Sequence, residues 1–387
     1  MHDYLVEHVN VPIHRVLLDE INWNDRLIAI KGSRGVGKTD FLLSYAKEFV
    51  QKYPDRKREI LYVNFNNFYF TKHSLYDFAG EFVREHGRVL LLDQTFKYQN
   101  WSKELRDCFF HYTDLKIVFM ASPVMKLEEG NNDIGHIVKV YNLRGLSFRE
   151  YLNLKTGMHI KVQTLDEILN HHGQVAMMLC DKLDPLAYFD DYLREGFYPS
   201  YTEQKNFSDQ LLKTMNMMLE VDVLLNKQID VASLQKLRLL LNCLMEEAPC
   251  SLNVSRLATE INVSRSSLMN FIKYLKDARL INLLYKPGRS FPMKPCKIYL
   301  HNTNLCYMLP TRKVSRQQIA ETYFYSALHG AHTLNATDNA TFLVDDTLKF
   351  DVRETMPRES GFRYCAVMDI KIGHGKQIPL WCFGLLY

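Results

Sequence analysis

The chain has 387 residues, enough for two or three domains and too many for one small module. Its hydrophobic fraction of 47% and charged fraction of 24% exclude an intrinsically disordered chain. The net charge of +4 is too small to indicate a partner, and no apolar run approaches the roughly 20 residues that a membrane-spanning helix needs.

The N-terminus and the cysteines indicate the compartment. Residues 1–8 include acidic side chains and lack the basic-then-apolar order of a secretory signal. The eight cysteines are scattered without a Cys-x-x-Cys pair, which argues against a zinc ribbon or a disulfide framework. We therefore expect a cytoplasmic protein that does not associate with membranes.

Strand and helix patterns alternate through residues 1–145. Short apolar runs typical of buried parallel strands lie at 26–31, 59–65, 88–93, 115–121 and, more weakly, 137–141. Helical patterns follow the first strand from Phe41 and recur at 73–86 and 101–111. This alternation predicts an α/β domain with a parallel sheet over residues 1–145.

A phosphate-binding loop follows the first predicted strand. The motif G-x-x-x-x-G-K-[ST] is matched in full by Gly32-Ser33-Arg34-Gly35-Val36-Gly37-Lys38-Thr39. Glycines let successive N–H groups point at phosphate oxygens, and the helix N-terminus adds its positive dipole end. We expect Lys38 to reach the β- and γ-phosphates of ATP and the Thr39 hydroxyl to ligate Mg²⁺. Asp40 completes the predicted contact set of the loop.

The third predicted strand ends in Asp93, which we expect to hold Mg²⁺ directly or through water. The next residue is Gln94, whose amide can hydrogen-bond a water molecule but cannot take its proton. General-base assistance is typically worth ~10²–10⁴-fold in rate, so slow or absent hydrolysis is favoured. The alternative is that Gln94 orients the attacking water and the chain is an active ATPase. Ser122, at the end of the fourth strand, is a candidate γ-phosphate sensor.

Helical spacing replaces the strand pattern from residue 146, so we predict a helical lid subdomain over 146–228. Arg144 or Arg149, at its start, is a candidate phosphate contact.

Residues 229–311 carry the pattern of a winged helix-turn-helix. The pattern consists of helices at 234–247, 254–261 and 265–278 and strands at 280–285 and 297–300. Ser264 is the expected N-cap of the third helix. Nine basic and two acidic residues lie within 253–298. The candidate contacts to DNA phosphates are Arg265, Lys273, Lys276 and Arg289. The alternative is that this domain only packs against the nucleotide domain or a partner subunit.

Residues 312–387 read as a small α/β domain. A helix is expected first, followed by strands at 341–350, 362–369 and 378–386.

The chain resembles bacterial ATPases of the AAA+ superfamily that carry a C-terminal domain of unknown function with a restriction-endonuclease-like fold. The resemblance covers nearly the whole chain. Its marks are residues 21–28, 34–39, 97–104, 114–119, 145–152, 192–199, 298–305 and 378–387. It implies an AAA+-like nucleotide domain, a helical lid, a winged helix and a nuclease-like terminal domain over 312–387.

The chain departs from this family where the chemistry of hydrolysis lies. The Asp-Glu pair of the family reads Asp93-Gln94, an acid after the second strand reads Asn66, and an arginine pair before the fifth strand reads Gly135-His136. A missing arginine of this kind is worth ~10³-fold or more in turnover. The resemblance therefore implies nucleotide binding with weakened hydrolysis.

The terminal domain departs in the same way. Glu321 matches the first acid of the nuclease-like site, but the next acid reads Thr341 and the following Glu reads Asp351, with no lysine close behind. Asp345 and Asp346 could bind a metal ion, although a solvated loop explains them as well. We expect a scaffold and not a nuclease.

Three functions remain open. The first is an Mg·ATP-dependent conformational switch with weak or absent hydrolysis. The second is an active ATPase, stimulated by DNA or completed by an arginine from a neighbouring subunit. The third is a DNA-binding regulator with a vestigial nucleotide site. Homo-oligomerisation or an unknown protein partner is compatible with each.

Overall fold

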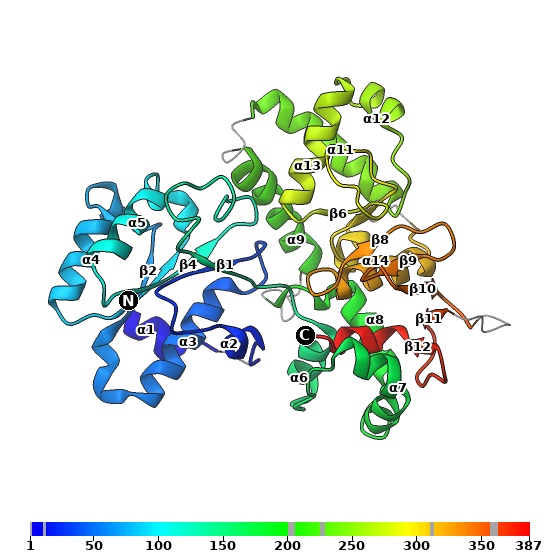
Figure 1. Cartoon of the computed structure of the whole chain (residues 1–387), viewed down its shortest axis with the longest axis horizontal. Helices are drawn as coiled ribbons and strands as arrows, with labels where there is room; N and C mark the ends of the chain where they lie inside the picture. The colour runs from blue at the N-terminus through cyan, green and yellow to red at the C-terminus, as the bar shows by residue number, and fades with distance from the viewer. Residues whose placement is uncertain (1, 11–12, 200–205, 225–228, 310–312, 357–362) are drawn as a thin grey trace. The chain divides into compact units, whose positions relative to one another are not determined.

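The computed structural model describes residues 2–10, 13–199, 206–224, 229–309, 313–356 and 363–387. It divides into two compact units, Met1–Gly145 and Leu146–Tyr387, which we call the first and the second unit (Figure 1). None of the described helices is long and apolar enough to cross a membrane.

A five-stranded, fully parallel sheet forms the centre of the first unit, as the sequence predicts. Its strands are β1 (Leu27–Lys31), β2 (Ile60–Asn64), β3 (Val89–Asp93), β4 (Lys116–Ala121) and β5 (Lys139–Asn142). They lie in the order β2-β3-β4-β1-β5. The strand that precedes the phosphate loop and the strand that ends in Asp93 are therefore separated only by β4, and all their carboxyl ends meet at one edge.

Helices cover both faces of this sheet (Figure 1). They are α1 (His2–His8), α2 (Leu17–Glu20), α3 (Lys38–Lys52), α4 (Leu75–Arg84) and α5 (Trp101–His111), with short 3₁₀ helices η1 (Pro54–Glu59), η2 (Phe68–Thr71) and η3 (Thr95–Lys97). Helices α4 and α5 bury Ala79 and Cys108 against Ala29 and Phe119 of the sheet. Every second strand residue points to the opposite face of the sheet, where α1 and α3 lie. Both faces are therefore covered by helices, which explains why the strands are continuous apolar runs in the sequence.

The second unit begins with helices, as predicted. These are α6 (Phe148–Thr156), α7 (Leu165–Cys180), α8 (Pro185–Asp191), the π-helix η4 (Tyr192–Gly196), α9 (Phe207–Met217) and the π-helix η6 (Met218–Val223). Ser147 begins α6 with a capping box, in which its hydroxyl accepts from the Glu150 N–H and the Glu150 carboxylate accepts from the Ser147 N–H.

Three helices and a strand pair follow where the sequence predicts them. They are α11 (Val231–Glu247), α12 (Val254–Glu260), α13 (Arg265–Asp277), β6 (Ile281–Leu284) and β7 (Lys297–Leu300). The two strands pair antiparallel. Ser264 is the N-cap of α13, because its hydroxyl accepts from the Ser267 N–H.

In the C-terminal part, two of the predicted strands differ from the structure. It contains η7 (Thr303–Tyr307), α14 (Arg316–Leu328), β8 (Leu334–Asn335), β9 (Phe342–Val344), β10 (Leu348–Arg353), β11 (Tyr364–Val367), β12 (Gln377–Pro379) and the 3₁₀ helix η8 (Leu380–Leu385). The strand predicted at 341–350 is wrong, because Asp345 and Asp346 adopt φ of 48° and 57° and reverse the chain between β9 and β10.

The strand predicted at 378–386 is also wrong beyond Pro379. A short apolar run cannot be told from a buried helical segment by its periodicity. Here the run forms η8, with Trp381 and Phe383 fully buried. A Cβ at Gly384 would lie 2.2 Å from the Tyr323 hydroxyl and 2.4 Å from the Phe148 Cβ, so only glycine fits this contact.

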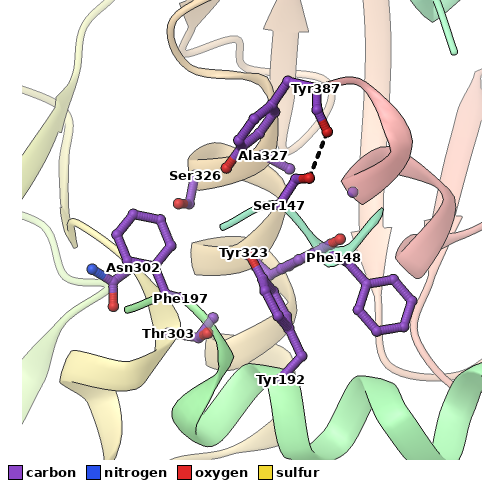
Figure 2. Close-up of a pocket in the computed structure, with 11 residues that line it drawn as sticks. Ser147, Phe148, Tyr192, Phe197, Asn302, Thr303, Tyr323, Ser326, Ala327 and Tyr387 are labelled. Atoms are coloured by element: carbon purple, nitrogen blue, oxygen red, sulfur yellow. Dashed lines mark hydrogen bonds between the residues drawn. The ribbon is translucent and has the colours of Figure 1, made fainter. Parts of the chain in front are cut away.

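The regions predicted as lid, winged helix and terminal domain share one core. Phe148 of α6 packs edge-on against Trp381 of η8, and the Tyr323 hydroxyl of α14 donates to the Trp381 main-chain oxygen. Figure 2 shows the small enclosed space where these parts meet, with the hydrogen bond from Ser147 to the Tyr387 main-chain oxygen. Asn304 donates to the main-chain oxygens of Tyr192 and Leu193. The boundaries predicted at 228 and 311 fall on residues outside the described ranges, and this division remains a prediction.

Candidate nucleotide site

The loop between β1 and α3 has a backbone that only glycines satisfy. Gly35 and Gly37 have φ of 81° and 85°, in the left-handed region that other residues rarely adopt. A Cβ on Gly32 would lie 2.7 Å from the Leu143 carbonyl oxygen, at the end of β5. The loop therefore curls at the carboxyl edge of the sheet and leads directly into the N-terminus of α3.

Lys38, the first residue of α3, bends back over this loop. Its Nζ donates to the main-chain oxygens of Gly32 and Ser33, both at 2.7 Å. The ammonium therefore lies at the mouth of the loop, the position from which the motif requires it to meet phosphate oxygens.

Asp93 and Thr39 are brought together as the sequence predicts. The Asp93 carboxylate is 2% exposed, and its Oδ2 accepts from the Thr39 hydroxyl at 2.7 Å. Its Oδ1 accepts from the Gln94 N–H at 2.7 Å. Gln94 itself has φ of 59°, so the chain turns sharply directly after the acid.

Tyr62 of β2 is a member of this cluster that the sequence did not indicate. Its hydroxyl donates to Asp93 Oδ2 at 2.9 Å and accepts from the Asn64 amide at 3.3 Å. Burial raises the pKa of Tyr62, and the neighbouring Asp93 charge raises it further, so the hydroxyl remains a donor at neutral pH. Tyr62 could be found only from the adjacency of β2 and β3, which the sheet order reveals and the sequence does not.

Two buried serine hydroxyls lie at this edge. Ser33 is 1% exposed and Ser122, directly after β4, is 4% exposed. Neither Oγ has a hydrogen-bond partner among the described residues. Buried polar groups are almost always hydrogen-bonded. A phosphate group with its oxygens at the loop would supply acceptors of the kind these hydroxyls lack, so the residues fit such a ligand.

The remaining predicted loop residues surround the mouth. The Arg34 guanidinium lies over the Phe96 ring at 5.0 Å, and Val36 is buried. Desolvation raises the pKa of Asp40, and the Asp93 carboxylate raises it further. Both acids therefore sit where a cation would relieve their repulsion.

Arg15 is a second residue that the sequence did not indicate. It is 8% exposed, and its guanidinium donates to the Val36 carbonyl oxygen at 3.0 Å. It also donates to the carbonyl oxygens of Arg144 at 2.6 Å and Gly145 at 3.4 Å. One side chain thus ties the phosphate loop to the last residues of the first unit.

The amide at the position of a family acid has a cationic partner. Asn66 accepts from Lys97 Nζ at 2.7 Å.

Arg149 is not a phosphate contact, and this expectation is wrong. Its side chain is buried in the second unit, where it donates to the main-chain oxygens of Tyr387 and Ile160 at 3.0 and 3.1 Å.

The predicted DNA contacts lie on exposed surface of the second unit. Arg265, Lys273 and Lys276 project from α13, and Arg289 lies in the loop between β6 and β7. Lys273 Nζ stands over the Phe291 ring at 4.7 Å.

The acids of the terminal domain have protein partners. Glu321 accepts from Lys297 and from the Tyr299 hydroxyl, both at 3.1 Å. Asp351 Oδ2 lies 3.6 Å from Arg363.

The two turn acids of this domain are engaged as well. Asp345 Oδ2 lies 2.7 Å from His332 Nδ1, and Asp346 Oδ1 accepts a hydrogen bond from the Asn335 side-chain amide at 3.0 Å. Over the described ranges, no group of three or more His, Cys, Asp or Glu side chains is placed to hold a metal ion.

Comparison with known families defines the class of the first unit. Residues 24–152, about a third of the chain, match a family described as an AAA domain. Residues 186–315 match a domain of unknown function, DUF8612. With its parallel sheet order and phosphate loop, the first unit has an AAA-type P-loop fold, which supports nucleotide binding.

The curated relatives do not name an activity. Uncharacterized protein MJ1637 of Methanocaldococcus jannaschii is 25% identical over 290 residues, which are 70% of this chain and 59% of that protein. Uncharacterized protein MJ1544 of the same organism is 22% identical over 67% of this chain and 56% of that protein. The chain thus spans less than three fifths of the length of either relative.

Two solved structures align with low scores. The ORC1 protein of Aeropyrum pernix, solved in complex with DNA, gives a TM-score of 0.31 at 12% identity, covering 79% of this chain and 89% of that chain. AMPPCP-bound DnaA of Aquifex aeolicus gives 0.27 at 15% identity, covering 67% and 86%. The class of the first unit therefore rests on its sheet, its loop and the family match.

Proposed function

We propose that the first unit binds Mg·ATP and hydrolyses it slowly or not at all, so that the protein acts as an ATP-held switch. The observation that carries this proposal is the cluster at the end of β3. There Asp93 accepts hydrogen bonds from Thr39, Tyr62 and the Gln94 N–H, while Gln94 occupies the position where a base would lie.

Each predicted residue has a role that its position supports. Lys38 would exchange its two carbonyl acceptors for β- and γ-phosphate oxygens, and the N–H groups of residues 33–39 would surround the phosphates. Thr39 and Asp93 would hold Mg²⁺, which supplies charge neutralisation between the phosphates. Ser122 would contact the γ-phosphate. Gln94 can orient water, but no atom of its amide accepts a proton at neutral pH.

Arg15 supports the switch part of the proposal. Its contacts join Val36 in the loop to Arg144 and Gly145, the residues through which the chain passes into the second unit. A ligand shifts such an equilibrium only if it binds one arrangement better, and a loop ordered by phosphates would fix the Arg15 contacts.

Phosphate release from Mg·ATP tests this proposal. We expect wild-type protein to release phosphate no faster than Lys38→Ala, which lacks the loop ammonium. We expect Gln94→Glu to turn over, by ~10²-fold or more above that background, because it restores a base. Wild-type release well above the Lys38→Ala background would instead make the chain an active ATPase.

A second candidate function is nucleic-acid binding by the second unit. The observation that favours it is the exposed basic stripe of α13, on which Lys273 and Lys276 lie one turn apart with Asn270 and Ser266 on the same face. Together with β6 and β7, helices α11 to α13 fit a winged helix-turn-helix, and we propose the terminal domain as its scaffold.

A further inference from the structure

The second unit contains an open groove beside α13, with about 670 Å³ of free space, a volume in the range of ligand sites. Three chain segments form its walls. They are 273–277 at the end of α13, 282–291 in β6 and the loop after it, and 325–334 from α14 to β8. Figure 1 shows α13, β6 and β8 side by side within this unit. The sequence had separated these segments into two predicted domains.

The loop after β6 is held as a wall of this groove. Tyr285 bridges to Asn335, and the Ala336 N–H donates to the Tyr285 carbonyl oxygen at 2.7 Å. Farther along the loop, Lys286 Nζ lies 2.9 Å from the exposed carboxylate of Asp338. The base of this loop therefore belongs to the C-terminal sheet as much as to the β6–β7 pair.

Cations and flat rings line the groove together. Lys273 and Lys276 are exposed on its α13 wall, and neither forms an ion pair within the described residues. Phe291 is partly buried beneath the Lys273 ammonium. The Tyr285 hydroxyl is buried and, among the described residues, has no hydrogen-bond partner. Asp277 is a carboxylate in the same lining.

We propose that this groove binds single-stranded nucleic acid. Lys273 and Lys276 meet the phosphates, and the rings of Phe291 and Tyr285 take unstacked bases, a combination typical of single-strand sites. A duplex keeps its bases stacked and is met by a convex helix in its major groove, so the rings inside a groove would not reach them. The inference rests on the second candidate function, nucleic-acid binding by this unit.

Fluorescence anisotropy with two labelled probes tests the inference on the full chain. The probes are a single strand of about 12 nucleotides and a duplex of the same sequence, each titrated over a range of salt concentrations. The variants are Lys273→Ala with Lys276→Ala, Phe291→Ala and Phe291→Leu. The matched control, Lys161→Ala with Lys213→Ala, removes the same charge from exposed positions of the same unit outside the groove.

We expect the single strand to bind more tightly than the duplex. The double lysine variant should lose about tenfold or more in affinity and lower the salt slope by about 1.4, since each phosphate contact contributes about 0.7. Both Phe291 variants should lose about five- to a hundredfold, because leucine keeps the apolar volume but not the stacking face. The control should match wild type.

Two results would overturn the inference. The first is that the duplex binds more tightly than the single strand and that the Phe291 variants do not change this binding. That result would contradict the groove proposal and would support nucleic-acid binding through the convex face of α13. The second is that neither probe shows salt-dependent binding, which would contradict both the groove proposal and nucleic-acid binding by this unit. Phosphate release by Gln94→Glu is read independently, so the nucleotide proposal stands or falls separately.

Discussion

At Asp93 a single carboxylate organises the candidate metal side of the nucleotide site. Its two oxygens accept from Thr39, Tyr62 and the N–H of Gln94. If Thr39 turns to ligate Mg²⁺, the Tyr62 hydroxyl remains the side-chain donor that keeps Asp93 Oδ2 oriented. We therefore propose that Tyr62 positions the metal side and does not contact the nucleotide.

The variant Tyr62→Phe tests this role. Removing one hydrogen bond of this kind costs about 1 kcal/mol, so we expect the Mg²⁺ concentration for half-maximal nucleotide binding to rise about fivefold. Nucleotide binding without Mg²⁺ should remain unchanged. Titration of a fluorescent ATP analogue with and without Mg²⁺ measures both quantities. Tyr53→Phe, a half-exposed position on the same unit, is the control. Equal losses with and without Mg²⁺ would contradict a role at the metal.

Single residues were predictable where the local sequence determines them. Lys38 and Thr39 follow from the loop motif, and Asp93 follows from its place at the end of an apolar strand. Tyr62 and Arg15 were not predictable, because Asp93 lies 31 residues from Tyr62, and Arg144 and Gly145, two of the three Arg15 partners, lie 129 and 130 residues from Arg15. Those contacts depend on which strands are neighbours, and periodicity carries no information about that.

At the level of elements, Arg15 connects two loops at the edge of the first sheet. Three carbonyl oxygens, of Val36, Arg144 and Gly145, accept from one buried guanidinium. Hydrogen bonds to charged groups are worth about 1.5–3 kcal/mol each, so losing them should loosen the loop before any phosphate binds.

We therefore expect Arg15→Ala to weaken nucleotide binding about tenfold and to lower the melting temperature. Arg15→Lys, which keeps the charge and fewer donors, should fall between it and wild type. Arg88→Ala breaks an exposed pair with Asp114 and serves as the control, since such pairs contribute little. Nucleotide titration and thermal melting measure both effects. If the Arg15→Ala protein melts at a lower temperature but binds nucleotide with wild-type affinity, Arg15 has only a structural role.

Elements were predictable where the chain stays regular over several turns or a full strand. All five strands of the first sheet and helix α5 lie within a few residues of their predicted ranges. The errors fall where a tight local conformation interrupts an apolar run. Asp345 and Asp346 turn one expected strand into the hairpin β9–β10, and the Gly384 contact allows η8 to bury its run as a helical turn.

At the scale of the whole molecule, sequence patterns divided the chain more finely than packing does. Patterns change at 146, 229 and 312, yet residues 146–387 form one compact unit. Aromatic contacts explain this: Phe148 and Phe189 from the region 146–228 and Trp381 from the region 312–387 lie in one core. Sequence periodicity reports which face of an element is buried, and not which other element covers it.

A change at the centre of this core should therefore act on all of its parts. Trp381 is fully buried, and truncation of such a residue costs about 3–5 kcal/mol. We expect Trp381→Ala to lower hydrogen-exchange protection of α6, α7 and α14 together, while the strands of the first unit keep theirs. Trp101→Ala, in α5 of the first unit, should give the reverse pattern. Loss of protection confined to residues 363–387 in Trp381→Ala would show that the helices of 146–199 fold independently of the terminal domain.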